Sequence, residues 1–249
     1  MKLLRRSVRL TRLVLHVLNG LVLTLLVAGV WRMSADAPFY QRLVSGWLRK
    51  TGQILGVRVR VIGEPVGQAA LMVSNHISWL DIALLGGAAN VRFLSKQEVR
   101  HWPIIGWLAE KSGTLFITRG KAGAAAAASA TILQALQAGR VVLLFPEGTT
   151  TTGNDVRTFH ARLLAPAFEA NVPVQPVALR YPGADGLTHP LVPYVEQQSL
   201  WDNLKSLLDE AEIQAEIHFL PLLQTTGVDR KTLAAACEQQ VRALVKRPA

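Results

Sequence analysis

The hydrophobic pattern of the chain begins with a long apolar run near the N-terminus. Residues 13–31 are almost entirely apolar, and five basic residues precede them within the first twelve positions. A cleaved signal peptide has the same order, a basic segment before an apolar one. The run is long for a signal peptide, however, and residues 32–37 offer only a poor A-x-A cleavage site. A membrane helix of about 20 residues is therefore the better interpretation.

A second helix is expected directly after this run. Within residues 38–55, large apolar side chains recur roughly on one helical face with basic residues between them: Phe39, Arg42, Leu43, Trp47, Leu48, Arg49 and Lys50. The pattern predicts an amphipathic helix on an anionic membrane surface, with a helix packed on its own domain as the alternative. Basic residues on both sides of the first run give no orientation across a bilayer. We expect residues 1–54 to form a membrane-associated module of two helices, and residues 55–249 a separate domain.

From residue 57 onward the apolar runs have the length of strands. Val and Arg alternate at 57–61, which predicts a half-buried strand, whereas continuous apolar runs at 71–73 and 141–145 predict buried strands. Further strands are expected at 91–94, 113–119, 174–180 and 215–220, and helices at 121–139, 161–170, 199–208 and 230–246. Residues 102–107 (WPIIGW) are expected to form an apolar lip. Strands alternating with helices predict an α/β layered domain, with a largely parallel or mixed central sheet flanked by helices.

The composition favours a lipid partner over nucleic acid. The chain is 50% hydrophobic and only 18% charged, whereas ordinary soluble domains contain about 25% charged residues. Its 27 Lys and Arg residues against 17 Asp and Glu give a net charge of +10, which implies an anionic partner. The hydrophobicity and the N-terminal run indicate anionic lipid. We see no zinc-finger spacing and no RRM signature, so we do not expect nucleic acid as a partner.

Several common chemistries lack their residues in this sequence. Cys237 is the only cysteine, in a helical segment where a packed thiol is expected, so no intrachain disulfide forms. Ser78 does not lie in a G-x-S-x-G motif, which argues against a serine hydrolase. Scattered histidines without H-E-x-x-H argue against a zinc site. No P-loop or dinucleotide fingerprint is present, so we expect neither a metal nor a cofactor-binding site.

Polar residues follow several of the predicted strands. The strand at 71–73 runs into Ser74-Asn75-His76, with Asp81 shortly after it at a position suited to cap the next helix. Arg119 ends another predicted strand, and residues 147–150 follow the strand at 141–145. Ligands of α/β sheets bind at the carboxyl ends of strands. A histidine with a nearby carboxylate has the parts of a base and its orienting partner, although alone such a pair is more often structural.

Four blocks in this sequence resemble those of the glycerolipid acyltransferases of the lysophosphatidate type. The blocks are NHISWLD, GTLFITR, FPEGTTT and VPVQPVAL, in the same order and with similar spacing, and the resemblance covers about residues 55–225. The segments KQEVRHWPIIGWLA and TTTGNDVRTFHARLL are similar to bacterial members that acylate lysophosphatidate or lyso-ornithine lipid. The resemblance implies an enzyme, an O-acyltransferase, and it also implies roles for individual residues.

By this resemblance His76 is the general base that takes a proton from the acceptor hydroxyl, which then attacks the thioester of the acyl donor. Asp81 holds the imidazole in the correct tautomer and stabilises the imidazolium, and Asn75 supports the turn that aims His76. His160 is considered a secondary, structural histidine.

The remaining implied roles concern substrate binding. Arg119 pairs with the phosphate of the acceptor, for which its forked donors are suited. Glu147 and Gly148, with Thr149 and Thr150 beside them, bind the acceptor head group, and the backbone N–H groups of Gly148 and Thr149 face the oxyanion.

The implied reaction moves an acyl chain from acyl-CoA or acyl-carrier protein to a lysophospholipid, most of all 1-acylglycerol-3-phosphate, which gives phosphatidate. Lyso-ornithine lipid is the alternative acceptor, and a non-catalytic membrane-anchored protein that binds anionic lipid is the alternative class. Both donors are cytosolic, so the catalytic domain is expected on the cytoplasmic face of the inner membrane. An N-terminus on that same face excludes a single crossing and predicts a helical hairpin within one leaflet.

Overall fold

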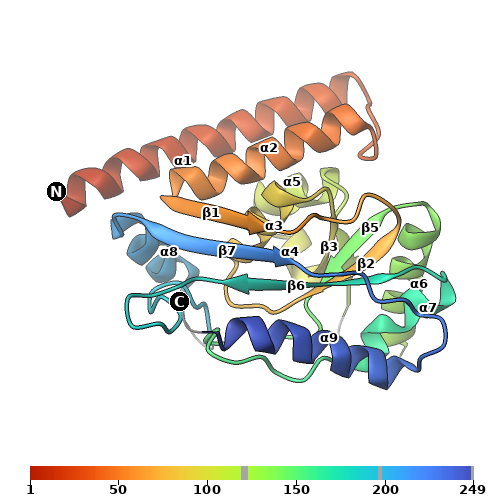
Figure 1. Ribbon diagram of the computed structural model, residues 1–249. Helices are drawn as coiled ribbons and strands as arrows, with labels where there is room; N and C mark the ends of the chain where they lie inside the picture. Colours follow the sequence, from red (N-terminus) through yellow and green to blue (C-terminus); the bar gives the residue numbers. More distant parts are fainter. Residues whose placement is uncertain (119–122, 196–197, 248–249) are drawn as a thin grey trace.

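The computed structural model describes residues 1–118, 123–195 and 198–247. Its centre is a seven-stranded sheet with the order β1-β7-β6-β2-β5-β3-β4 (Figure 1). The strands are β1 (Val57–Ile62), β2 (Ala70–Ser74), β3 (Arg92–Lys96), β4 (Leu115–Ile117), β5 (Val141–Leu144), β6 (Val174–Arg180) and β7 (Ile213–Phe219). Strands β6, β2, β5, β3 and β4 are parallel to one another, while β1 and β7 run the opposite way. The sheet is therefore mixed, as the alternation of strands and helices predicted.

Helices cover both faces of the sheet. They are α1 (Lys2–Thr24), continued by the π-helical turn η1 (Leu25–Val30), α2 (Pro38–Ile54), α3 (Leu80–Ala88), α4 (Gln97–Arg100), α5 (Ile105–Lys111), α6 (Ala124–Gln137), the 3-10 turn η2 (Ala161–Leu164), α7 (Ala165–Glu169), α8 (Leu200–Asp209) and α9 (Arg230–Val245). Met72 of β2 packs into the core with α3 and α8, whereas its neighbours Leu71 and Val73 pack with α6 and α9. Successive side chains of a strand point to opposite faces, so one strand contributes to both cores.

The edge strand β1 differs from its sequence prediction. Residues 57–61 do form a strand, but only Val57 of the three valines is buried, while Val59 and Val61 are 40% and 48% exposed. The alternation of apolar residues suggested a covered face along the whole strand. Because β1 lies at the end of the strand order, its second half packs less than an interior strand does.

The first two helices form an antiparallel hairpin along one side of the molecule (Figure 1). The rings of His16 and Trp47 stack with centroids 4.6 Å apart, and the Trp47 indole donates to the His16 carbonyl over 3.0 Å. Helix α2 also packs on α3. A helix packed on its own domain was the alternative to an amphipathic helix on a membrane surface for this segment. Among the described residues, Lys2–Val30 is the one helix long and apolar enough to cross a membrane, and most of it is not buried in the protein.

The N-terminal arginines bind the end of α8. Arg6 donates to the Asp209 carboxylate over 2.7 Å, and Arg5 donates to the Asp209 carbonyl. Arg9 donates to the Ala211 carbonyl over 2.9 Å. Carbonyl groups at a helix C-terminus lack intrahelical donors and carry partial negative charge. These contacts hold the start of α1 against the sheet domain.

The connection between the two hairpin helices is also attached to the sheet domain. Asp36 forms ion pairs with Arg92 and Arg140, at 2.7 and 2.5 Å. Arg92 is buried and donates to the carbonyls of Ala35 and Ser112 as well. Both ends of α1 are therefore fixed to the rest of the chain, and the hairpin has a defined position on the domain.

Candidate active site

The loop after β2 brings His76 and Asp81 together. The His76 Nδ1 lies 2.8 Å from the Asp81 Oδ2, and the side chains are 19% and 0% exposed. Helix α3 begins at Leu80 with Trp79 at its N-cap position, so Asp81 lies in the first turn. The prediction that Asp81 caps this helix was therefore wrong by two positions. Its carboxylate turns back to the preceding loop instead.

Asp81 is held by four hydrogen-bond donors. Its Oδ2 accepts from His76 Nδ1 and from the backbone N–H groups of Ile77 and Ser78, at 2.7 and 3.0 Å. Its Oδ1 accepts from the Tyr181 hydroxyl at 2.7 Å. A fully buried carboxylate is costly unless hydrogen bonds compensate for the lost water. These donors stabilise the carboxylate and fix its orientation toward His76.

Tyr181 is the residue of this arrangement that sequence reasoning missed. Its side chain is 1% exposed, and burial together with the nearby Asp81 raises the pKa of its hydroxyl well above the usual value. It therefore remains a neutral donor. Tyr181 comes directly after β6, which is parallel to β2. A tyrosine directly after a buried strand could have indicated a site residue, but the sequence alone did not show that β6 lies beside β2.

The imidazole of His76 has a fixed orientation. Its ring stacks on that of Phe145, with centroids 3.8 Å apart and the planes 10° from parallel. The Nδ1 faces Asp81, so hydrogen bonding to the carboxylate assigns the proton to Nδ1 and leaves Nε2 as an acceptor. The arrangement supplies an oriented base, and Phe145, directly after β5, is the second positioning residue that the sequence did not reveal.

Glu147 connects the main chain of two loops. One carboxylate oxygen accepts from the His76 N–H at 2.8 Å and the other from the Arg157 N–H at 2.7 Å. The side chain is 4% exposed, and burial raises the pKa of its carboxyl. Glu147 thus positions the backbone of the candidate base. A contact between Glu147 and an acceptor head group stays a prediction.

The three residues after Glu147 have different contacts. Gly148 adopts a φ of +76°, which favours glycine, and its N–H donates to the Phe145 carbonyl at 3.1 Å. Thr149 is exposed. The Thr150 hydroxyl donates to the Tyr194 carbonyl at 2.5 Å. Their predicted role in substrate binding stays a prediction, and Thr149 is the one with an exposed side chain.

Two further predicted residues lie close to the same edge of the sheet. The Asn75 side chain donates to the Leu179 carbonyl at 2.9 Å and accepts from the Leu179 N–H at 2.8 Å. This pair ties the end of β2 to β6, and the supporting role of Asn75 stays a prediction. The backbone N–H of His160 donates to the Pro146 carbonyl at 3.1 Å, so His160 is placed beside the same loop. Arg119 lies outside the described residues.

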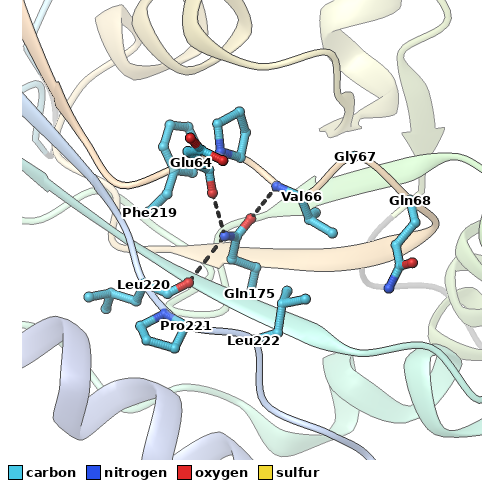
Figure 2. A pocket seen from close by; sticks show the side chains of 10 residues that line it. Glu64, Val66, Gly67, Gln68, Gln175, Phe219, Leu220, Pro221 and Leu222 are labelled. Atoms are coloured by element: carbon cyan, nitrogen blue, oxygen red, sulfur yellow. Dashed lines mark hydrogen bonds between the residues drawn. The ribbon is translucent and has the colours of Figure 1, made fainter.

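A surface cavity of about 670 Å³ lies elsewhere on the sheet (Figure 2). At its centre the Gln175 amide donates to the carbonyls of Glu64 and Leu220 and accepts from the Val66 N–H. Gln175 is near the start of β6, whereas His76 follows the end of the parallel strand β2. The cavity and the His76 site are therefore at opposite ends of these strands. In the described part of the chain, no cluster of three or more His, Cys, Asp or Glu side chains could hold a metal ion.

Comparisons with known proteins show the family of this chain. The family model described as Acyltransferase matches residues 58–180. A lyso-ornithine lipid O-acyltransferase of Pseudomonas aeruginosa is 45% identical over 244 residues, which cover 97% of this chain and 93% of that relative. A second protein of that name, from Brucella abortus, is 35% identical over 89% of this chain and 93% of its own length. A 1-acyl-sn-glycerol-3-phosphate acyltransferase of Neisseria meningitidis is 29% identical over 85% of this chain and 96% of its own.

The fold has a known counterpart. The crystal structure of a 1-acyl-sn-glycerophosphate acyltransferase from Thermotoga maritima superimposes with a TM-score of 0.74 at 20% identity, covering 99% of this chain and 97% of the other. This likeness supports the layered fold alone. The identity to the Pseudomonas relative over nearly the whole of both chains shows the family. The chain therefore belongs to the acyltransferase family and is an enzyme that transfers acyl groups to lysolipids.

Proposed function

We propose that this enzyme acylates the free hydroxyl of lyso-ornithine lipid, with acyl-CoA or acyl-carrier protein as the donor. The observation that carries the catalytic part is the His76–Asp81 pair at 2.8 Å. The acceptor is supported by the 45% identity to the Pseudomonas relative, against 29% for the Neisseria enzyme that is named for the glycerophosphate acceptor. The sequence motifs placed lysophosphatidate first, and the proposal reverses that order.

The proposed reaction uses His76 as a general base. Its Nε2 accepts the proton of the acceptor hydroxyl while the oxygen attacks the thioester carbonyl carbon. The tetrahedral intermediate then expels the thiolate, which takes the proton back from His76, so the products are an ester and a free thiol. Asp81 stabilises the imidazolium that exists between these two steps. A base of this kind contributes about 10²–10⁴ in rate.

The oxyanion and the head group require further donors. Because the Gly148 N–H donates to the Phe145 carbonyl, we assign the oxyanion to the N–H of Thr149, the next residue in this turn. Arg119 would bind the anionic group of the acceptor, which is a carboxylate in lyso-ornithine lipid and a phosphate in lysophosphatidate. Its forked guanidinium is suited to either group. No cofactor takes part in this scheme.

The position of the hairpin supports a location on one face of the membrane. Arg5, Arg6 and Arg9 contact the α8 end of the catalytic domain, so the N-terminus and this domain lie on the same side. A helix that crossed the bilayer once would separate them. We place α1 and α2 within one leaflet of the inner membrane and the catalytic domain on its cytoplasmic face, where both donors are found. An N-terminal tag protected from protease in vesicles that expose the catalytic domain would contradict this placement.

The acceptor is tested by offering both lysolipids to the purified full-length enzyme. Labelled acyl-CoA and acyl-carrier protein are each supplied with lyso-ornithine lipid or lysophosphatidate, and the His76→Ala variant serves as the blank. The proposal expects a higher kcat/KM with lyso-ornithine lipid. A higher value with lysophosphatidate would keep the mechanism and overturn the acceptor. No transfer to either lysolipid by the wild type would overturn both acceptors.

A further inference from the structure

The apolar lip at residues 102–107 is exposed over most of its length. Trp102, Ile104 and Ile105 are 46%, 43% and 41% exposed, and Pro103 between them is exposed too. Large apolar side chains grouped on a surface mark a site of contact with a partner or a membrane more often than isolated ones do. These side chains follow the short helix α4 and end at the start of α5.

The backbone holds the lip in one compact turn. The Ile105 N–H donates to the Pro103 carbonyl at 2.6 Å, and the Gly106 N–H donates to the Trp102 carbonyl at 3.0 Å. A side chain at Gly106 would lie 2.2 Å from the Arg100 carbonyl oxygen, so only glycine fits there. Ile104 adopts a φ of +64°, which is rare for a β-branched residue. Strained backbone of this kind persists where the surroundings enforce it, and it is often found at functional positions.

The lip lies between the catalytic edge of the sheet and the hairpin. Strand β3 is parallel to β5 with Phe93 opposite Leu143, so the end of β3 is level with the loop that carries Phe145 and Glu147. Helix α4 starts directly after β3. On its other side, α5 contacts α1. The lip therefore lies, along the chain, between a strand that ends level with the Phe145–Glu147 loop and a helix that contacts α1.

The helical hairpin of α1 and α2 also exposes apolar side chains. Those at least 40% exposed between positions 14 and 39 are Val14, Leu15, Leu18, Val22, Leu25, Leu26, Val30, Trp31 and Phe39. Since the enzyme acts on lysolipids and Lys2–Val30 has the length and composition of a membrane helix, a bilayer is the partner that fits this surface. Trp102 is of the residue type that concentrates at the interface between headgroups and hydrocarbon.

We propose that the apolar lip is a second membrane contact, which inserts into the same leaflet as the exposed face of α1. Two contacts at different points fix the orientation of a domain on a surface, whereas a single helix lets it rotate. With the lip inserted, the His76 edge faces the bilayer from which the lysolipid comes. The occupant is thus a phospholipid surface, and the inference depends on membrane association without depending on which lysolipid is the acceptor.

The test measures how deeply the lip inserts into the bilayer of lipid vesicles. Ile105→Cys is labelled with a nitrobenzoxadiazole fluorophore in the full-length protein. The native Cys237 stays unlabelled because it is fully buried, with a thiol pKa raised to about 12. Val61→Cys, on the opposite edge strand and 48% exposed, is the matched control. The protein is bound, at less than one copy per vesicle, to vesicles of phosphatidylethanolamine and phosphatidylglycerol that contain or lack doxyl-labelled phospholipid.

The proposal expects the label at position 105 to be quenched by doxyl lipid and protected from aqueous iodide, and the label at position 61 to show the reverse. Ile104→Asn, introduced into the labelled Ile105→Cys protein, should shift the equilibrium between inserted and free lip about tenfold or more toward the free lip, because the isoleucine side chain no longer contributes its burial in hydrocarbon. Because the φ of +64° and ψ of −61° at position 104 lie outside the left-handed region that asparagine favours, thermal unfolding is used to check that this variant folds. Strong iodide quenching at position 105 would overturn the proposal. Iodide protection without doxyl quenching, lost when the protein is diluted, would overturn it in favour of contact with a second copy.

Discussion

Tyr181→Phe tests whether the tyrosine positions the catalytic pair or only fills space. The change removes the hydroxyl that donates to the Asp81 Oδ1 at 2.7 Å and keeps the ring, so no cavity forms. A hydrogen bond to a charged group contributes about 1.5–3 kcal/mol. We therefore expect the free energy of unfolding to fall by about 2 kcal/mol, which lowers the thermal midpoint by about 4–8 °C for a chain of this size.

The effect on catalysis has a defined sign. Asp81 keeps its other three donors, including His76, so we expect kcat to fall by less than about tenfold. Losing one donor leaves more negative charge facing His76 and favours the protonated imidazole. The acid limb of the pH profile of kcat/KM should therefore move to higher pH.

Tyr194→Phe is the matched control, because the described contacts of Tyr194 are made by its main chain. Acyl transfer is measured across the pH range for both variants and the wild type. If the acid limbs of the kcat/KM profiles of Tyr181→Phe and the wild type coincide, Tyr181 has only a structural role. A limb that moves to lower pH would contradict the reasoning on charge.

Three other predictions concern single side chains. Glu147→Gln should lower both kcat and the thermal midpoint, because the NH₂ group of the new amide, itself a donor, would face one of the two backbone N–H donors, that of His76 or that of Arg157. Unchanged values would show that the carboxylate is dispensable. The contacts of Asp155 with Lys246 and Arg242 lower the pKa of its carboxyl, so its stabilising contribution is present above the ordinary pKa and is lost as pH falls. Asp155→Asn should therefore reduce the acid dependence of the thermal midpoint, and an identical dependence would exclude this role. Cys237 should react with a maleimide only after unfolding, because burial raises the pKa of its thiol to about 12, and rapid labelling of the folded protein would contradict its packing.

The sheet was largely predictable because its strands are short apolar runs bounded by polar residues. The runs at 71–73 and 141–145 became β2 and β5 at the centre of the sheet. The exposure of Val59 and Val61 was not predictable from their alternation with arginine. Which strand lies at an edge depends on the order of strands, and a local pattern does not contain that order.

The candidate site was predictable where its residues are close in sequence. His76 and Asp81 are five positions apart, and one loop with one helical turn brings them together. Tyr181 is 100 positions from Asp81, and its contact exists because β6 pairs with β2. The contacts of Arg5, Arg6 and Arg9 at the end of α8 likewise join residues more than 200 positions apart. In the sequence these arginines suggested only contact with anionic lipid.

Acyl transfer by the His76→Ala variant tests whether His76 is the catalytic base. The assay uses purified enzyme with labelled acyl donor and lyso-ornithine lipid or lysophosphatidate, and vesicle flotation confirms that the variant still binds membranes. His101→Ala, at an exposed histidine after α4, is the matched control. We predict a rate lower by about 10²–10⁴ for His76→Ala, with unchanged flotation and a wild-type rate for His101→Ala. Transfer by His76→Ala at the wild-type rate would show that His76 is not the catalytic base.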